Sequence, residues 1–126
     1  MKLKIKDLMN YSRSYEELSK EKMPVALAYK LSKISKEINE QIEFYQSQYN
    51  TYLQLYAEKN EDGTFKMNEQ GNGFILQKDN IEEAQKKFAE LDSYDFPIES
   101  VPISLNDLAG LDVSPEVMKG LLPFLE

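Results

Sequence analysis

The longest uninterrupted segment of this chain lies between Pro24 and Gly63, where no glycine or proline occurs. Proline suits the first position of a helix, because its missing N–H has no partner there. Apolar or aromatic side chains then follow at alternating spacings of four and three, with Ser35 as the only polar member: Ala28, Leu31, Ile38, Ile42, Tyr45, Tyr49, Tyr52 and Tyr56. This heptad pattern predicts one long amphipathic helix over residues 24–58.

A helix of this length is larger than the rest of the chain can cover. It would be about 50 Å long, which exceeds the diameter of a domain of 126 residues. We therefore expect part of it to project, or to pack against a surface outside its own core. Phenol rings combine apolar area with a hydrogen-bonding tip and are enriched where proteins meet. This makes four side chains the candidate partner interface, although core packing explains the same spacing: Tyr45, Tyr49, Tyr52 and Tyr56.

Shorter elements surround the long helix. Residues 2–5 alternate lysine with apolar side chains, as in a short edge strand, and Asp7 is placed to cap a helix that follows. Residues 64–77 contain two short apolar runs around a glycine-rich loop, which predicts a β-hairpin. Further helices are expected after Asn80, which starts a capping box, and after Ser114, which is followed by proline.

The segment 96–103 is apolar and extended but contains two prolines. Because each proline removes a backbone donor, this segment belongs at the edge of a sheet, where we expect it to pair with the N-terminal strand. The apolar C-terminal residues 120–126 are expected to dock into the core. The prediction is a single α+β domain over residues 1–126, with the long helix, the hairpin, two or three shorter helices and a small sheet.

The composition restricts the chemistry that the chain can perform. It contains no cysteine and no histidine, which excludes thiolate nucleophiles and disulfides and removes the usual general base and metal ligand. Adjacent acids such as Glu82 and Glu83 point to different faces of a helix, whereas acid–base catalysis needs two carboxylates across a cleft. We therefore predict no catalytic, cofactor-binding or metal site, and no enzymatic activity; a carboxylate enzyme remains an alternative.

One segment partly matches a calcium-binding loop. Residues 58–69 place oxygen donors at loop positions one, three and five, Gly63 at six and Glu69 at twelve. However, Lys66 occupies position nine, and two glycines follow where the exiting helix should begin. A helix end that runs into a hairpin explains the same residues without an ion, so a calcium-regulated module is only an alternative.

The net charge of −7 is unevenly distributed. Residues 1–60 carry ten Lys or Arg against eight Asp or Glu, whereas residues 61–126 carry five against fourteen. Nucleic-acid binding needs clustered positive charge, so we do not expect a nucleic-acid partner. No segment has the roughly 20 apolar residues of a membrane span, and the first residues do not form a signal peptide. We expect a cytoplasmic protein without a membrane partner.

Several segments together resemble small uncharacterised proteins encoded by phages and prophages of Gram-positive bacteria. They are the opening LKIKDLMN, the helical ALAYKLSKISKEINE, the turn AEKNEDG and the C-terminal VPISLNDLAGLDVSPEVMKGLLPFLE. The resemblance spans most of the chain and includes no reactive motif. It implies a phage origin and a place in the host bacterial cytoplasm.

Together these observations predict a non-catalytic protein-binding module. The first hypothesis is a phage accessory protein that binds a host protein and inhibits or modulates it, in host takeover or anti-defence. The alternative is a virion or assembly component that self-associates through the long helix into a homo-oligomer. The sequence itself does not identify the partner.

Overall fold

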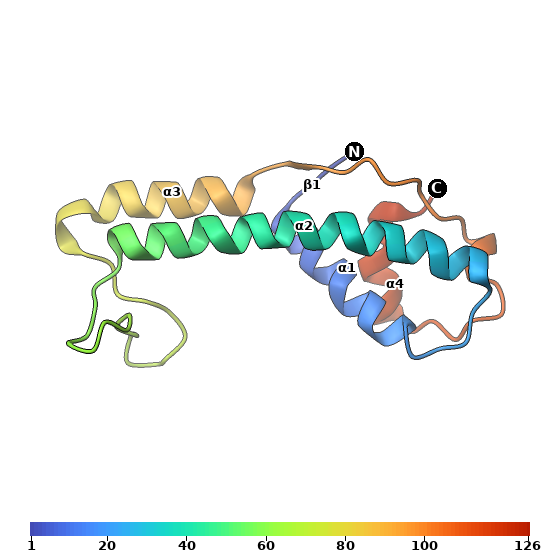
Figure 1. The fold of residues 1–126 in the computed structure, drawn as a ribbon, viewed down its shortest axis with the longest axis horizontal. Helices are drawn as coiled ribbons and strands as arrows, with labels where there is room; N and C mark the ends of the chain where they lie inside the picture. The colour runs from blue at the N-terminus through green and yellow to red at the C-terminus, as the bar shows by residue number, and fades with distance from the viewer. The chain divides into compact units, whose positions relative to one another are not determined.

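The computed structural model describes all 126 residues and is mostly helical. Figure 1 shows the arrangement of its helices and strands. The elements are β1 (Lys2–Leu3), α1 (Ile5–Leu18), α2 (Val25–Tyr56), the 3-10 turn Lys78–Asn80, α3 (Ile81–Ser93), β2 (Phe96–Pro97), the 3-10 turn Asn106–Leu108, α4 (Pro115–Leu121) and the 3-10 turn Leu122–Phe124. The predicted long helix is confirmed as the unbroken α2, and three shorter helices accompany it. A two-stranded antiparallel sheet completes the α+β architecture.

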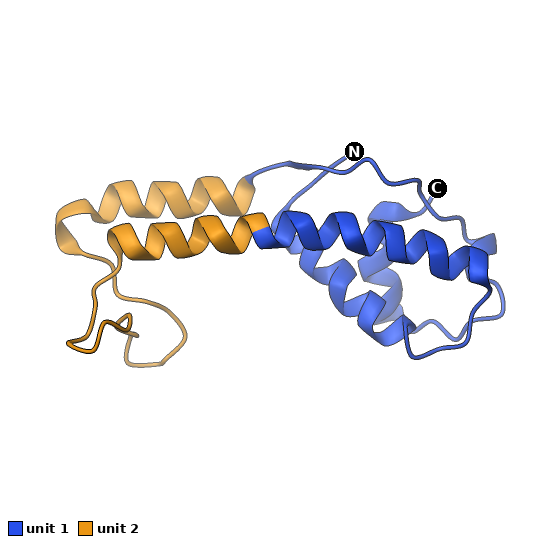
Figure 2. Ribbon diagram, viewed as in Figure 1, with its two compact units in different colours: residues 1–43, 94–126 blue, residues 44–93 orange.

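The chain folds into two compact units, coloured separately in Figure 2. Unit 1 combines Met1–Glu43 with Tyr94–Glu126, and unit 2 is the intervening Phe44–Ser93. Helix α2 contributes residues 25–43 to unit 1 and residues 44–56 to unit 2.

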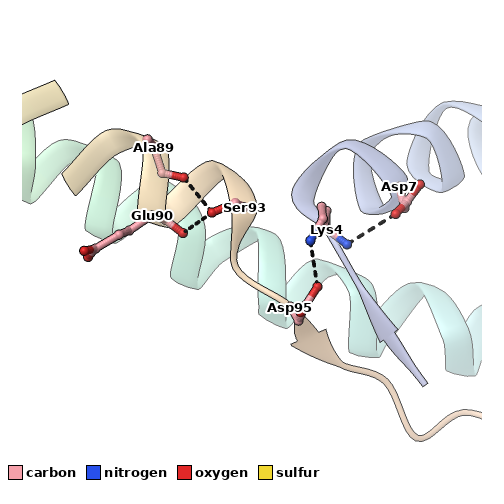
Figure 3. Close-up of polar contacts among 6 residues, drawn as sticks. All are labelled: Lys4, Asp7, Ala89, Glu90, Ser93 and Asp95. Atoms are coloured by element: carbon pink, nitrogen blue, oxygen red, sulfur yellow. Dashed lines mark hydrogen bonds and ion pairs between the residues drawn. The ribbon is translucent and has the colours of Figure 1, made fainter. Parts of the chain in front are cut away.

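The start of the chain differs from the prediction in one respect. Strand β1 ends at Leu3 and α1 begins at Ile5, so the expected strand over residues 2–5 is shorter and the helix starts before Asp7. The reason is that Asp7 lies in the first turn, where its carboxylate accepts the N–H of Lys4 at 3.3 Å. Figure 3 shows this bond and the ion pair of 2.9 Å between Lys4 Nζ and Asp95 Oδ1.

The expected pairing of the N-terminal strand with the 96–103 segment is present at the start of that segment. Leu3 pairs with Phe96, and the backbone N–H of Ile98 donates to the Met1 carbonyl at 2.7 Å. Further along, Ile103 does not pair with the N-terminal strand; it forms a parallel bridge with Leu125 instead. The segment thus pairs with both ends of the chain within unit 1.

The core of unit 1 contains the buried side of α2. Leu31 and Ile38 are fully buried, as the heptad pattern predicts. The polar member of the pattern, Ser35, is buried as well, and its hydroxyl lies 3.1 Å from the hydroxyl of Tyr11 on α1. Tyr11 also donates to the Leu31 carbonyl at 2.8 Å, so the buried polar atoms at this contact are hydrogen-bonded.

Helices α1 and α4 approach each other closely at a small residue. Gly120 on α4 is buried against Ser14 and Asn10 of α1, and a Cβ at this position would overlap both. The Ser14 hydroxyl donates to the Val117 carbonyl at 2.8 Å across the same contact. As expected, Ser114 caps α4, and Phe124 from the C-terminal segment is fully buried.

Unit 2 consists of the second part of α2, α3 and the segment that connects them. The two runs of the predicted hairpin over residues 64–77 are joined by a single isolated antiparallel bridge, Met67 with Phe74, and neither run forms a regular strand. Glu58 bonds to both runs: Lys66 donates to the carbonyl of Glu58, and Glu58 donates to the carbonyl of Ile75, whose own N–H donates to the carbonyl of Lys66. The prediction of a hairpin is therefore correct in that the two runs lie side by side, and wrong in that neither run is a regular strand.

Candidate functional site

The four tyrosines of the candidate interface all lie in unit 2, where they are half-buried. The rings of Tyr49 and Tyr52 contact Phe88 of α3, with ring centroids 5.1 and 5.7 Å apart. Tyr45 stacks on Tyr49, and Tyr56 lies beside Tyr52. The aromatic stripe therefore packs at least partly against a helix of its own unit.

The hydroxyl groups at the ends of this stripe meet acidic side chains of α3. Tyr45 donates a hydrogen bond of 2.7 Å to Asp92 Oδ1. Burial raises the pKa of the Tyr45 hydroxyl, and the hydrogen bond to Asp92 raises it further, so the phenol stays protonated as a donor. Tyr56 is placed similarly: desolvation and the Glu83 carboxylate raise its pKa. These phenols act as hydrogen-bond donors between two helices.

Replacing Tyr52 with alanine distinguishes the two roles that the sequence allows for this side chain, packing in the core and binding at an interface. Because Tyr52 meets Phe88 edge-on, we expect Tyr52→Ala to lower the free energy of unfolding by about 2 kcal/mol and to leave any association with other molecules unchanged. Urea denaturation and light scattering measure the two effects. The exposed neighbour Thr51 supplies the control variant Thr51→Ala. Loss of association without loss of stability would instead place Tyr52 at an interface.

A second candidate site lies in unit 1, in a groove of about 650 Å³. One wall is the exposed side of α2 and the other is the extended segment 99–101. Two apolar side chains are prominent at this groove: Tyr29 is 63% exposed and Val101 is 69% exposed. Lys33 lies over the Tyr29 ring, with Nζ 5.3 Å from the centroid. Exposed apolar side chains gathered at a groove with a polar rim are typical of binding surfaces.

Glu37 fixes the shape of this groove. Its carboxylate accepts three hydrogen bonds from the facing segment: from the backbone N–H of Glu99 at 2.9 Å, and from the N–H and hydroxyl of Ser100 at 3.0 and 2.6 Å. Burial opposes ionisation, but these hydrogen bonds outweigh it and lower the pKa of Glu37. One charged side chain thus holds both walls of the groove together.

The stabilisation from Glu37 should depend on pH. Because the folded protein holds the pKa of Glu37 below its ordinary value, the stabilisation is fully present above the ordinary pKa of about 4.3 and is lost as the pH falls through the folded value. We expect Glu37→Gln to be less stable than the wild type at neutral pH, with a difference that shrinks below about pH 4. Urea denaturation at several pH values measures this.

The control for this experiment is Glu16→Gln, because Glu16 is exposed on α1 and makes no ion pair. We expect this variant to follow the wild type at each pH. A constant difference between Glu37→Gln and the wild type down to acidic pH would contradict the assigned hydrogen bonds.

Sequence reasoning did not find the groove. Glu37 bonds to Glu99 and Ser100, which lie 62 and 63 positions later in the sequence, and no local sequence pattern predicts such a contact. A weaker indication was present in α2. Tyr29 lies outside the heptad stripe, on the polar side of the helix, where a large aromatic side chain is unusual.

The segment 58–69, which partly matches a calcium-binding loop, follows directly after α2 and Ala57. No group of three or more acidic side chains is gathered in a way that could hold a metal ion. Within residues 58–69, Asp62 accepts hydrogen bonds from the N–H and hydroxyl of Thr64, which closes a turn. The segment thus has the local structure of a turn between helix and hairpin.

Comparisons with known proteins identify no relative of this chain. No family model, curated protein or solved structure matches this chain. None of the helices combines the length and the apolar character needed to cross a membrane.

Proposed function

We propose that this chain is a non-catalytic protein-binding module whose recognition surface is the groove of unit 1. The observation that carries the proposal is the pair of exposed apolar side chains, Tyr29 and Val101, on opposite walls of that groove. Covering such side chains removes apolar area from water, at about 25 cal/mol per Å². A tyrosine set among lysines and glutamates is also the kind of anchor that dominates binding energy at protein interfaces.

Two further features support a role in recognition over catalysis. The chain has no histidine or cysteine, and Glu37, the acid of α2 that binds the segment 99–101, already accepts three hydrogen bonds. Its lowered pKa keeps it ionised at neutral pH, whereas a general acid or base works best with a pKa near the operating pH. Glu37 is thus suited to hold the groove in shape.

The resemblance to phage and prophage proteins gives the proposal a biological setting. In that setting the chain acts in the host bacterial cytoplasm, where it binds a host protein and inhibits or modulates it. Because the two walls of the groove are connected by Glu37, the binding surface exists before the partner arrives. Preorganisation of this kind reduces the entropic cost of binding.

Affinity capture tests the proposal with the full chain as bait in a lysate of a Gram-positive host. We expect one dominant bacterial protein to be retained by the wild type and lost with the groove variant Val101→Asp. The control is Tyr94→Ala, since Tyr94 is also an exposed aromatic residue of unit 1 but does not line the groove. Retention of no host protein, or equal retention by Val101→Asp, would refute the proposal.

A further inference from the structure

The exposed side of α2 in unit 1 carries an ordered pattern of charge. Three lysines are followed by three glutamates, with a spacing of three within each set and with Lys36 adjacent to Glu37: Lys30, Lys33, Lys36, Glu37, Glu40 and Glu43. Spacings of three and four keep helical side chains on one face, and five of the six line the groove. The first half of this face is therefore basic, and the second half is acidic.

Ion pairs and hydrogen bonds inside the chain occupy only two of these charges. Lys30 pairs with Asp107 at 3.0 Å, and Glu37 binds the segment 99–101. Lys33, Lys36 and Glu40 are exposed, and none of them makes an ion pair in the structure. Within one helix, a lysine placed four residues before a glutamate stabilises less than the reverse order, so the pattern is not optimised for helix stability.

The pattern has a symmetry of its own. Its six positions are symmetric about the midpoint between Lys36 and Glu37. Each lysine lies as far before this midpoint as one glutamate lies after it. An antiparallel copy of α2, related by a two-fold axis between Lys36 and Glu37, would place Lys33 of one copy opposite Glu40 of the other. The same axis creates this pair twice, because a two-fold interface uses the same surface on both subunits.

We propose that the groove of unit 1 is covered by a second copy of this chain, in an antiparallel dimer formed by the charged face of α2. The paired charges set the register and the direction of the two helices. Tyr29 and Val101 supply apolar area at the same surface. This occupant follows from charge complementarity: about the two-fold axis each lysine of the face lies opposite a glutamate, and Lys33 and Glu40, which make no ion pair within the chain, would pair with each other.

This inference rests on the proposed function, since it takes the groove to be a protein-binding surface. It adds a form of regulation, because the dimer covers the surface that a host protein would use. A host partner at the groove then has to displace the second copy, and a monomeric variant should bind it more readily than the wild type does.

Sedimentation-equilibrium measurements on the full chain test the dimer with two single charge reversals. Lys33→Glu and Glu40→Lys each create like-charge contacts at two symmetric places, and we expect each to weaken the dimer about tenfold. An equimolar mixture should form a heterodimer, because every contact between the two variants is again between opposite charges. The double variant Lys33→Glu/Glu40→Lys should restore the homodimer.

Lys86→Glu is the matched control, since Lys86 is exposed on α3, makes no ion pair and does not line the groove. We expect it to sediment like the wild type. A wild type that stays monomeric throughout a dilution series would overturn the dimer, as would single variants that remain dimeric or a mixture that does not associate. A monomeric wild type that still loses its host protein on Val101→Asp would refute the dimer alone and leave the proposed function standing.

Discussion

The variant Gly120→Ala should lose at least about 3 kcal/mol of stability, although it adds only one methyl group. This methyl group would overlap Ser14 Oγ and the carbonyl oxygen of Asn10. The serine side chain can rotate, but the carbonyl belongs to the backbone of α1 and moves only with the helix. We therefore expect α1 and α4 to separate, with a large decrease in the urea midpoint.

Two further variants identify the cause of this loss. Lys119→Ala, at an exposed position on the same helix, should change stability by less than about 0.5 kcal/mol. Ser14→Ala combined with Gly120→Ala should recover only part of the loss, because the overlap with Asn10 persists and the hydrogen bond from Ser14 to Val117 is removed. Full recovery in the double variant would show that the backbone of α1 is not the obstacle.

Replacing Ile38 with aspartate should also cost about 4 kcal/mol or more. Ile38 is fully buried in unit 1, so a carboxylate there would be removed from water. Either the charge remains desolvated, or the pKa of the new side chain rises and a neutral acid replaces an apolar group; both outcomes destabilise the fold. Urea denaturation monitored by circular dichroism measures the loss.

The adjacent variant Asn39→Asp adds the same charge at an exposed position of the same helix. It should stay within about 0.5 kcal/mol of the wild type. If both variants were equally stable, the side of α2 that faces the core of unit 1 would be assigned incorrectly.

The long helix was predictable because its two determinants are local. The absence of glycine and proline keeps the backbone helical, and the heptad pattern marks the buried side, so Leu31 and Ile38 were placed correctly. Ser35 looked like an exception in this pattern. Its hydroxyl bonds to Tyr11, a residue 24 positions away, and only the structure brings the two together.

Predictions that depended on distant contacts were less accurate. The hairpin is irregular because residues 57–59, which follow α2, share the pairing: Ala57 forms a bridge with Leu76, and Lys59 forms one with Phe65. The groove was missed because one wall comes from the 99–101 segment, which Glu37 holds from more than 60 positions away. The charge pattern along α2 was visible in the sequence, but its meaning depends on knowing which side of the helix is exposed.

The division of the chain has a consequence for the order in which it folds during synthesis. Unit 2 is contiguous, so it can form as soon as residue 93 has left the ribosome. Unit 1 must wait, because its N-terminal stretch is completed by contacts such as Ser14 with Val117, 103 positions apart. Loop closure over such a distance is slow. We expect the newly made chain to pass through a stage in which the second half of α2 is already paired with α3, while the first half still lacks the partners that residues 94–126 supply, such as Asp107 for Lys30 and Ser100 for Glu37.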